Sequence, residues 1–167
     1  VVAAPEELAF ENGKLHFDGQ LVDLIYNRLT DFGLSGQDAI RQAWENGGVV
    51  LTPDPPAHKR MADKRNLVKL SDSAFLRGID AGEEDIAIVG RLVPKTVLVT
   101  HENADALWAE RKRYYFKPVS GFGGKAVYRG EKLTRKTWDW ILGEDYVAQE
   151  SASPAQRIVR TEGGSGT

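Results

Sequence analysis

The stretch YYFKPVSGFGGKAVYRG, residues 114–130, decides how the second half of this sequence is expected to fold. Its aromatic and alternating residues predict strands over 114–119 and 126–129, joined by a glycine-rich loop. Glycines at this spacing let backbone N–H groups approach an anion, because no Cβ stands in the way. Lys117 lies just before the loop, where a fixed cation suits a triphosphate. The alternative is a flexible hairpin with a surface lysine, and Lys125, after the loop, fits either interpretation.

Three well-known phosphate motifs do not fit this loop. A Walker A loop ends in Gly-Lys followed by Ser or Thr and a helix, whereas Gly124-Lys125 is followed by Ala126 and a strand. The dinucleotide fingerprint fails in its spacing and in the helix that should follow it. A kinase glycine-rich loop has its lysine on the strand after the glycines. Here Lys117 and Pro118 come first, and the glycine-rich loop follows between two strands.

The segment before this region predicts a helix over about 57–76. At about 100° per residue, Lys64 falls in the middle of the apolar side of that helix, where a lysine is unusual. It either contacts a ligand or extends its ammonium group past Val68 to water. Residues 78–90 are acidic and contain several glycines, which predicts a loop with a short strand and a solvated acidic face. The apolar side consists of Met61, Leu67, Val68 and Phe75.

Four pieces of the sequence together resemble the ATP-grasp superfamily. DKRNLVKLSD (63–72) resembles the helix at the start of that family's nucleotide lobe, and LVPKTVLV (92–99) resembles the strand that follows it. The third piece is the Lys-Pro and glycine-rich loop of 114–130, and DYVAQE (145–150) is similar to the hinge strand of the adenine pocket. The stretches YNRLTDF and KPVSGFGGKAVYRGEKLTRKTW are most similar to a bacterial ATP-grasp group related to glutathione-synthetase-like ligases.

This resemblance implies that ATP binds to residues of the second segment. Lysines would hold the phosphates, the loop would cover them, and the hinge strand would contact adenine largely through backbone groups. The family's Mg²⁺ ligands lie downstream of the hinge, where this sequence has only Glu162 as an acid, so no metal ligand is assigned and Mg²⁺ is expected only in the longer relative. The residues implied in ATP binding are Lys64, Lys117, Ser120, Gly121, Phe122, Gly123, Gly124, Lys125, Gln149 and Glu150.

The first segment reads as strands and turns around one helix. Asn12-Gly13 and Asp18-Gly19 predict tight hairpin turns, and the apolar run 21–26 predicts a strand buried on both faces. Ser35 and Asp38 predict the start of a helix that ends at glycines 47 and 48. Arg28, just after the apolar run, could hold a substrate carboxylate or could form an ion pair with Asp23. The resemblance implies that this leading domain binds the small carboxylate or amine substrate. These candidate substrate residues are Asp23, Asn27 and Arg28.

The composition excludes several classes of protein. The 167 residues contain no cysteine, which excludes disulfides, thiolate metal sites and a cysteine nucleophile. The 22 basic and 24 acidic side chains give a net charge of −2, so neither nucleic acid nor a membrane is an expected partner. The three histidines have no metal-ligand spacing and are expected in solvated loops or strands. We expect a cytoplasmic protein, and the sequence does not indicate its oligomeric state.

The resemblance implies an α/β (α+β) fold with two parts. A partial pre-ATP-grasp domain is expected over 1–56 and the first, nucleotide-binding ATP-grasp subdomain over 57–152. A flexible tail, or the truncated start of a second subdomain, would occupy 153–167. The expected function is the ATP-binding portion of a carboxylate–amine ligase that acts through an acylphosphate, catalytically incomplete as this chain. The alternative is a non-catalytic ATP-grasp-like module that binds a nucleotide or a partner.

Overall fold

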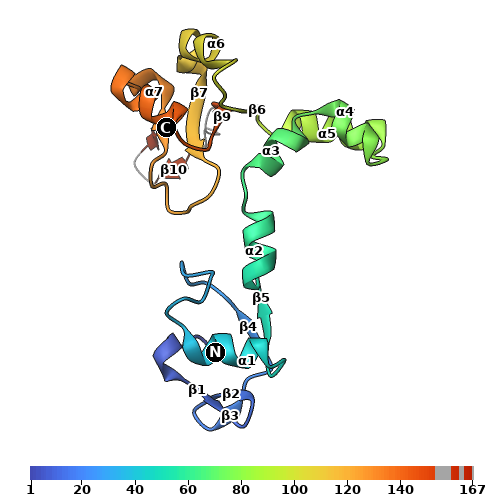
Figure 1. The fold of residues 1–167 in the computed structure, drawn as a ribbon, viewed down its shortest axis with the longest axis vertical. Coiled ribbons are helices and arrows are strands. Elements are labelled where there is room, and N and C mark those ends of the chain that lie inside the picture. Colours follow the sequence, from blue (N-terminus) through green and yellow to red (C-terminus); the bar gives the residue numbers. More distant parts are fainter. Residues whose placement is uncertain (153–158, 162–163, 167) are drawn as a thin grey trace. The chain divides into compact units, whose positions relative to one another are not determined.

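The computed structural model describes residues 1–152, 159–161 and 164–166. The chain is mixed α/β, with helices and several separate sheets (Figure 1). It forms two compact units, Val1–Asp63 (unit 1) and Lys64–Thr167 (unit 2). The sequence placed a boundary between residues 56 and 57, whereas the two units meet between Asp63 and Lys64.

Unit 1 begins with an antiparallel meander. The turn residues Asn12, Gly13, Asp18 and Gly19 all have positive φ, between 48° and 78°, so both predicted tight turns are confirmed. These backbone angles favour Asn, Asp and Gly, which explains why the two dipeptides fix the hairpins. A short 3₁₀ helix precedes the sheet, whose strand order is β1-β2-β3. The elements are η1 (Pro5–Glu7), β1 (Leu8–Glu11), β2 (Lys14–Phe17) and β3 (Gln20–Leu21).

A second, two-stranded sheet in unit 1 is parallel, with β4 (Leu24–Tyr26) paired to β5 (Val50–Thr52). The prediction of one strand over 21–26, buried on both faces, is wrong. The run is divided between β3 and β4, and Leu24 and Tyr26 are 58% and 66% exposed. In β4, only Ile25 packs against the core, because neighbouring side chains of a strand point to opposite faces.

The helix between these two strands, α1 (Asp38–Glu45), covers the core of unit 1. Ile40 and Ala43 are buried on its inner face, as its apolar spacing predicts. The predicted capping pair of Ser35 and Asp38 is wrong. Asp31 instead accepts hydrogen bonds from the backbone N–H groups of Ser35 and Gly36, at 3.1 and 2.8 Å. These N–H donors also lower the pKa of the Asp31 carboxyl.

The predicted single helix over 57–76 is wrong, because this segment forms three helices. The first ends at Met61, and shortly after it the backbone N–H of Lys64 donates to the carbonyl oxygen of Val119 at 2.9 Å. Asp72 separates the next two, since its side chain accepts from the N–H groups of Ala74 and Phe75. The predicted loop over 78–90 is also wrong, because a fourth helix begins at Glu83. The helices are α2 (Pro55–Met61), α3 (Arg65–Leu70), α4 (Ser73–Gly78) and α5 (Glu83–Leu92).

Unit 2 is built on a four-stranded antiparallel sheet with the order β6-β9-β7-β8. One face of this sheet packs against two helices and forms the core, in which Phe116 and Tyr146 are completely buried (Figure 1). The strands are β6 (Thr96–Leu98), β7 (Tyr114–Pro118), β8 (Tyr128–Arg129) and β9 (Tyr146–Glu150). The helices are α6 (Ala104–Ala109), α7 (Arg135–Leu142), η2 (Arg111–Arg113) and η3 (Gly130–Lys132).

Thr134 is a residue type that predicts the start of a helix, and the structure confirms that α7 begins directly after it. The hydroxyl of Thr134 accepts a hydrogen bond from the N–H of Thr137 at 3.2 Å. Leu133 and Trp138, on either side of this cap, are buried in the same cluster, as in a hydrophobic staple. Gly143 follows the last turn.

Little of the predicted tail or second-subdomain start lies within the described residues. Residues 153–158, 162–163 and 167 are outside them, and what is described is an antiparallel pair of β10 (Val159–Thr161) and β11 (Gly164–Gly166). Across the described ranges, no helix is long and apolar enough to cross a bilayer.

Gly130 gives a test of the packing between η2 and η3. A Cβ at this position would lie 1.8 Å from the carbonyl oxygen of Arg111, so Gly130→Ala must displace backbone. We expect it to destabilise unit 2 by at least about 1–3 kcal/mol. Gly90→Ala is the matched control, since its Cβ meets nothing within 4 Å and alanine favours the helix by about 0.5–1 kcal/mol. Denaturant unfolding followed by tryptophan fluorescence measures both, and equal stability of the two variants would contradict the packing.

Candidate functional site

The face of the unit 2 sheet opposite the core carries polar side chains. Gln149 of β9 lies opposite Thr96 in β6 and opposite Tyr115 in β7. Lys117, two residues after Tyr115, therefore shares this face with Gln149. We call Lys117, Gln149 and Thr96 the polar triad. Its members come from three strands, and strand pairing alone brings them together.

The polar triad is joined by hydrogen bonds in a fixed order. The ammonium group of Lys117 donates to Oε1 of Gln149 at 2.6 Å, and Nε2 of Gln149 lies 3.2 Å from the hydroxyl oxygen of Thr96. The Thr96 hydroxyl donates to the carbonyl oxygen of Pro94 at 2.9 Å. Thr96 is 1% and Gln149 9% exposed, so water competes little for these bonds.

Helix α3 is attached to the sheet beside the polar triad. The N–H of Thr96 donates to the hydroxyl oxygen of Ser71 at 2.9 Å, and this hydroxyl donates to the carbonyl oxygen of Leu67 at 2.8 Å. Ser71 thus links the last turn of α3 to the first residue of β6. No local sequence pattern indicates a role for Ser71 or Thr96, because their contacts depend on the packing of α3 against β6.

Lys64 lies at the other end of α3, at its N-cap position. Its ammonium group donates to the carbonyl oxygen of Gly121 at 3.2 Å, and its backbone N–H donates to Val119. The reason given from the sequence, a lysine within the apolar side of one long helix, is wrong because that helix does not exist. In the structure, Lys64 contacts the glycine-rich loop through its ammonium group.

The loop between β7 and β8 is open on its outer side. Gly121, Gly123 and Gly124 have φ values of 109°, 67° and 69°, and a Cβ on any of them would meet nothing within 4 Å. Among the described residues, no acceptor is found for the backbone N–H groups of 120–124. Consecutive N–H groups without acceptors can form a concave site for an anion. The ammonium group of Lys125 lies 5.6 Å from the ring centre of Phe122.

The structure does not bring Glu150 to the polar triad. Glu150 follows Gln149 in β9, so its side chain points to the other face of the sheet. There its carboxylate accepts a hydrogen bond from Arg113 at 3.1 Å, while its backbone N–H donates to Lys95. The sequence grouped Gln149 and Glu150, and strand alternation separates their side chains.

A cavity of about 730 Å³ lies at the loop end of the same sheet. Tyr146 lines it, and the Tyr146 hydroxyl donates to the carbonyl oxygen of Ala126 at 2.9 Å, which holds the end of the loop. Burial raises the pKa of Tyr146 to about 12, with smaller contributions from Tyr128 and Glu144. The other lining residues are Val99, Thr100, His101, Glu102, Pro118, Val119, Ser120, Ala126, Trp140, Leu142, Gly143, Glu144 and Asp145.

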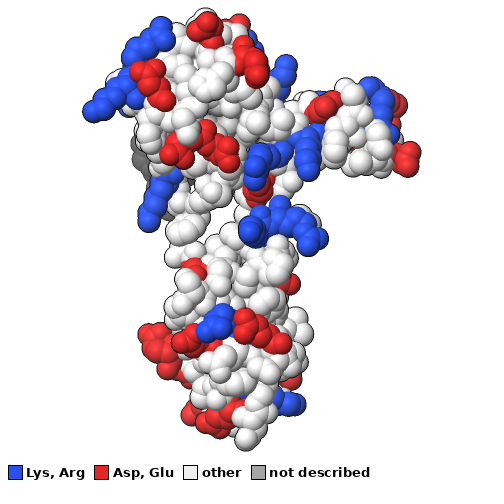
Figure 2. All heavy atoms as spheres, in the orientation of Figure 1, with Lys and Arg blue, Asp and Glu red and all other residues white. Residues whose placement is uncertain are grey.

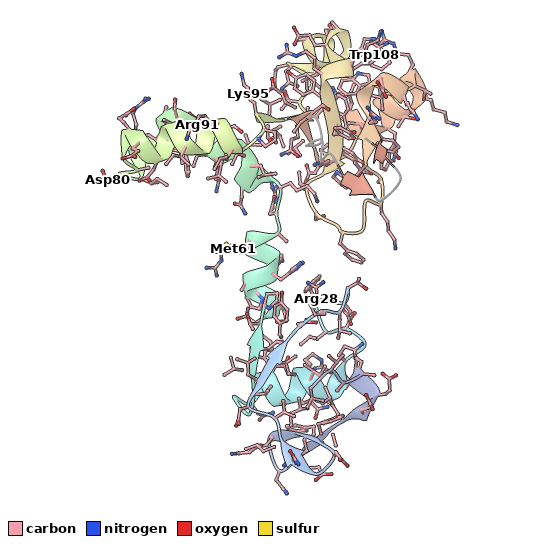
Figure 3. All side chains as sticks on the ribbon, turned by 180° about the vertical axis from the view of Figure 1, so that it is seen from behind. Arg28, Met61, Asp80, Arg91, Lys95 and Trp108 are labelled. Atoms are coloured by element: carbon pink, nitrogen blue, oxygen red, sulfur yellow. The ribbon has the colours of Figure 1, made fainter. Side chains whose placement is uncertain are left out.

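The three candidate substrate residues, Asp23, Asn27 and Arg28, line one cavity of about 610 Å³ in unit 1. No ion pair joins Asp23 to Arg28, both of which are described. The guanidinium group of Arg28 (labelled in Figure 3) lies 5.8 Å from the ring centre of Tyr26. Asn27 is 4% exposed, and its Oδ1 accepts from the N–H of Leu29 at 2.9 Å. Its Nδ2 finds no partner in the described part of the chain.

The charged surface and the histidines indicate no further site. Acidic and basic side chains are interspersed over the upper part of the view in Figure 2. Within the described ranges, no three His, Cys, Asp or Glu side chains are grouped to hold a metal ion. His58 was expected in a solvated loop or strand, but it lies in α2 and stacks on Phe32 at 3.7 Å between ring centres.

The sequence matches no protein-family model and no curated protein with which it was compared.

The raised pKa of Tyr146 predicts that the free energy of unfolding depends on pH above about pH 10. Its pKa is about 12 in the folded chain against a reference of 10.0, so its contribution is complete below about pH 10 and is lost as the pH rises through 12. We expect the free energy of unfolding of the wild type to fall across this window by up to about 3 kcal/mol more than that of Tyr146→Phe. Denaturant unfolding at pH 8–12 measures it, with Tyr115→Phe as the control. Parallel curves for wild type and Tyr146→Phe would contradict the assignment.

Proposed function

We propose that unit 2 binds ATP as the nucleotide-binding lobe of an ATP-grasp carboxylate–amine ligase. The observation that supports it best is the combination of Lys117, on the polar face of the sheet, with a following loop that leaves the N–H groups of 120–124 unpaired. An ammonium group beside consecutive N–H donors suits the oxygens of a triphosphate. Lys64, already in contact with the loop carbonyl of Gly121, would supply a second cation.

The chemistry of such a ligase assigns each group a task. The γ-phosphoryl group of ATP passes to a carboxylate, ADP leaves, and an amine then displaces phosphate from the acylphosphate. Lys64, Lys117 and the loop donors would hold and neutralise the phosphates during transfer. Mg²⁺, where bound, would neutralise further charge on the phosphates. The described residues of this chain offer no cluster of acids for it.

The cavity of unit 1 is the proposed position of the small carboxylate or amine substrate. Arg28 can pair with a carboxylate, and Nδ2 of Asn27 is a buried donor that lacks an acceptor. The absence of an ion pair between Asp23 and Arg28 favours this role over the alternative of a structural pair.

The alternative function is a module that binds nucleotide, or a partner, without catalysis. It is favoured by the lack of a group of metal-ligating side chains within the described residues. ATP-dependent release of ADP or phosphate by the 167-residue chain would exclude this alternative.

Lys117 gives the direct test of nucleotide binding. We expect Lys117→Ala to weaken the binding of a fluorescent ATP analogue about 10- to 100-fold, because a hydrogen bond from a charged group is lost. Lys112→Ala is the matched control, since Lys112 is an exposed lysine of η2, away from the polar triad. A fluorescence titration measures the three affinities. Equal binding by wild type and Lys117→Ala would remove the role of that lysine.

Asn27 gives a separate test in unit 1. Asn27→Asp keeps an oxygen for the N–H of Leu29 but replaces the unpaired donor Nδ2 with an acceptor. We expect hexanoate, a probe carboxylate with an apolar chain, to bind the variant at least about tenfold more weakly than the wild type. Asn46→Asp is the control, because it adds the same charge in unit 1 outside the cavity lining. Calorimetric titration showing equal affinity for wild type and Asn27→Asp would contradict the substrate role.

A further inference from the structure

The Thr96 hydroxyl determines which way the amide of Gln149 faces. A hydroxyl has one proton, and the carbonyl oxygen of Pro94, 2.9 Å away, can only accept it. The oxygen of Thr96 is therefore left as an acceptor for its other neighbour. Only the NH₂ end of Gln149 can donate to it, so the carbonyl end of the amide must point away from Thr96.

Lys117 fixes the same orientation from the other side. An ammonium group has three protons and no lone pair, so the atom 2.6 Å from it must be an acceptor. Oε1 of Gln149 meets this requirement and Nε2 does not. The amide is thus held at both ends, and turning it over would place donor against donor at Lys117.

The partner that holds Lys117 carries no charge. Within the described residues, Lys117 forms no ion pair with a carboxylate. Gln149 uses one of the three ammonium protons and leaves two for other acceptors. A glutamate of the same length would hold the lysine in the same place but would cancel its charge.

We propose that Gln149 and Thr96 are positioning residues that hold the Lys117 ammonium group for a phosphate while leaving its charge uncompensated. This inference rests on the proposed binding of ATP by unit 2. Thr96 acts through Gln149, and Ser71 fixes the backbone of Thr96 to α3. The site therefore has two separate properties, the charge at Lys117 and the orientation of the Gln149 amide, and different substitutions change each of them.

Three substitutions of the full chain separate these properties. Gln149→Glu keeps the shape and adds a negative charge beside Lys117. Thr96→Val keeps the shape and removes the hydroxyl, so the Gln149 amide is held only at its Lys117 end. Thr96→Ser keeps the hydroxyl and serves as the conservative rescue. Adenosine is the second ligand, because it has the base and sugar but no phosphate for Lys117 to hold.

The experiment measures, for each protein, the ratio of its affinity for a fluorescent ATP analogue to its affinity for adenosine. We expect this ratio to fall about 10- to 100-fold in Gln149→Glu and about 3- to 10-fold in Thr96→Val. In Thr96→Ser it should stay within about twofold of the wild type. A purely structural role would lower both affinities together and leave the ratio unchanged. Thermal melting of each variant identifies any loss of folding.

The possible outcomes distinguish this inference from the proposed function. If the wild type did not bind the ATP analogue, both the proposed function and this inference would be contradicted. Wild-type binding that is weakened by Lys117→Ala, with an unchanged ratio in Gln149→Glu, would keep the proposed function and overturn the inference. A lower ratio in Gln149→Glu with an unchanged ratio in Thr96→Val would overturn the role of Thr96 alone. If Thr96→Val does not fold, the pair of Gln149→Glu and Thr96→Ser still decides the charge argument.

Discussion

The pairing of β9 with both β6 and β7 is the constraint on which unit 2 depends. Its side chains alternate, so Tyr146 and Ala148 enter the apolar core while Val147 and Gln149 face the other side. The same backbone bonds therefore hold the core and align the three strands that supply the polar triad. A register shift by one residue would exchange the two faces, burying Gln149 in the core. Core packing thus fixes the position of the candidate site.

The pairing of donors with acceptors explains how polar side chains are tolerated on a largely buried face of the sheet. Thr96 and Gln149 have little exposure, and a buried polar atom without a partner costs about 1–3 kcal/mol. In the polar triad every donor group meets an acceptor. Lys117 donates to Oε1 of Gln149, Nε2 of Gln149 donates to the Thr96 hydroxyl, and that hydroxyl donates to the carbonyl oxygen of Pro94. This order gives the site one arrangement, with a cation at its more exposed end and a neutral amide behind it.

Local rules predicted the parts of the fold that depend on a few neighbouring residues. The turns at Asn12-Gly13 and Asp18-Gly19 require positive φ, and the cap at Thr134 requires one hydroxyl. The break between α2 and α3 was missed because the N–H of Lys64 bonds to Val119, a residue distant in the sequence. Likewise, the alternation of side chains along a strand predicts that Lys117 and Tyr115 share one face of the sheet. The bond from Lys117 to Gln149, however, depends on the pairing of β7 with β9, which no local pattern specifies.

The two candidate sites differ in how completely their polar atoms are paired. In the polar triad of unit 2 the amide of Gln149 is bonded at both ends, so the site holds its geometry without a ligand. In unit 1 the amide of Asn27 is bonded at Oδ1 only, and its Nδ2 has no partner within the described residues. A ligand oxygen that accepted this proton would remove the desolvation penalty of the amide as well as form a bond. A ligand at unit 1 would therefore complete the bonding of a buried amide, whereas a ligand at the polar triad would meet the remaining protons and the charge of Lys117.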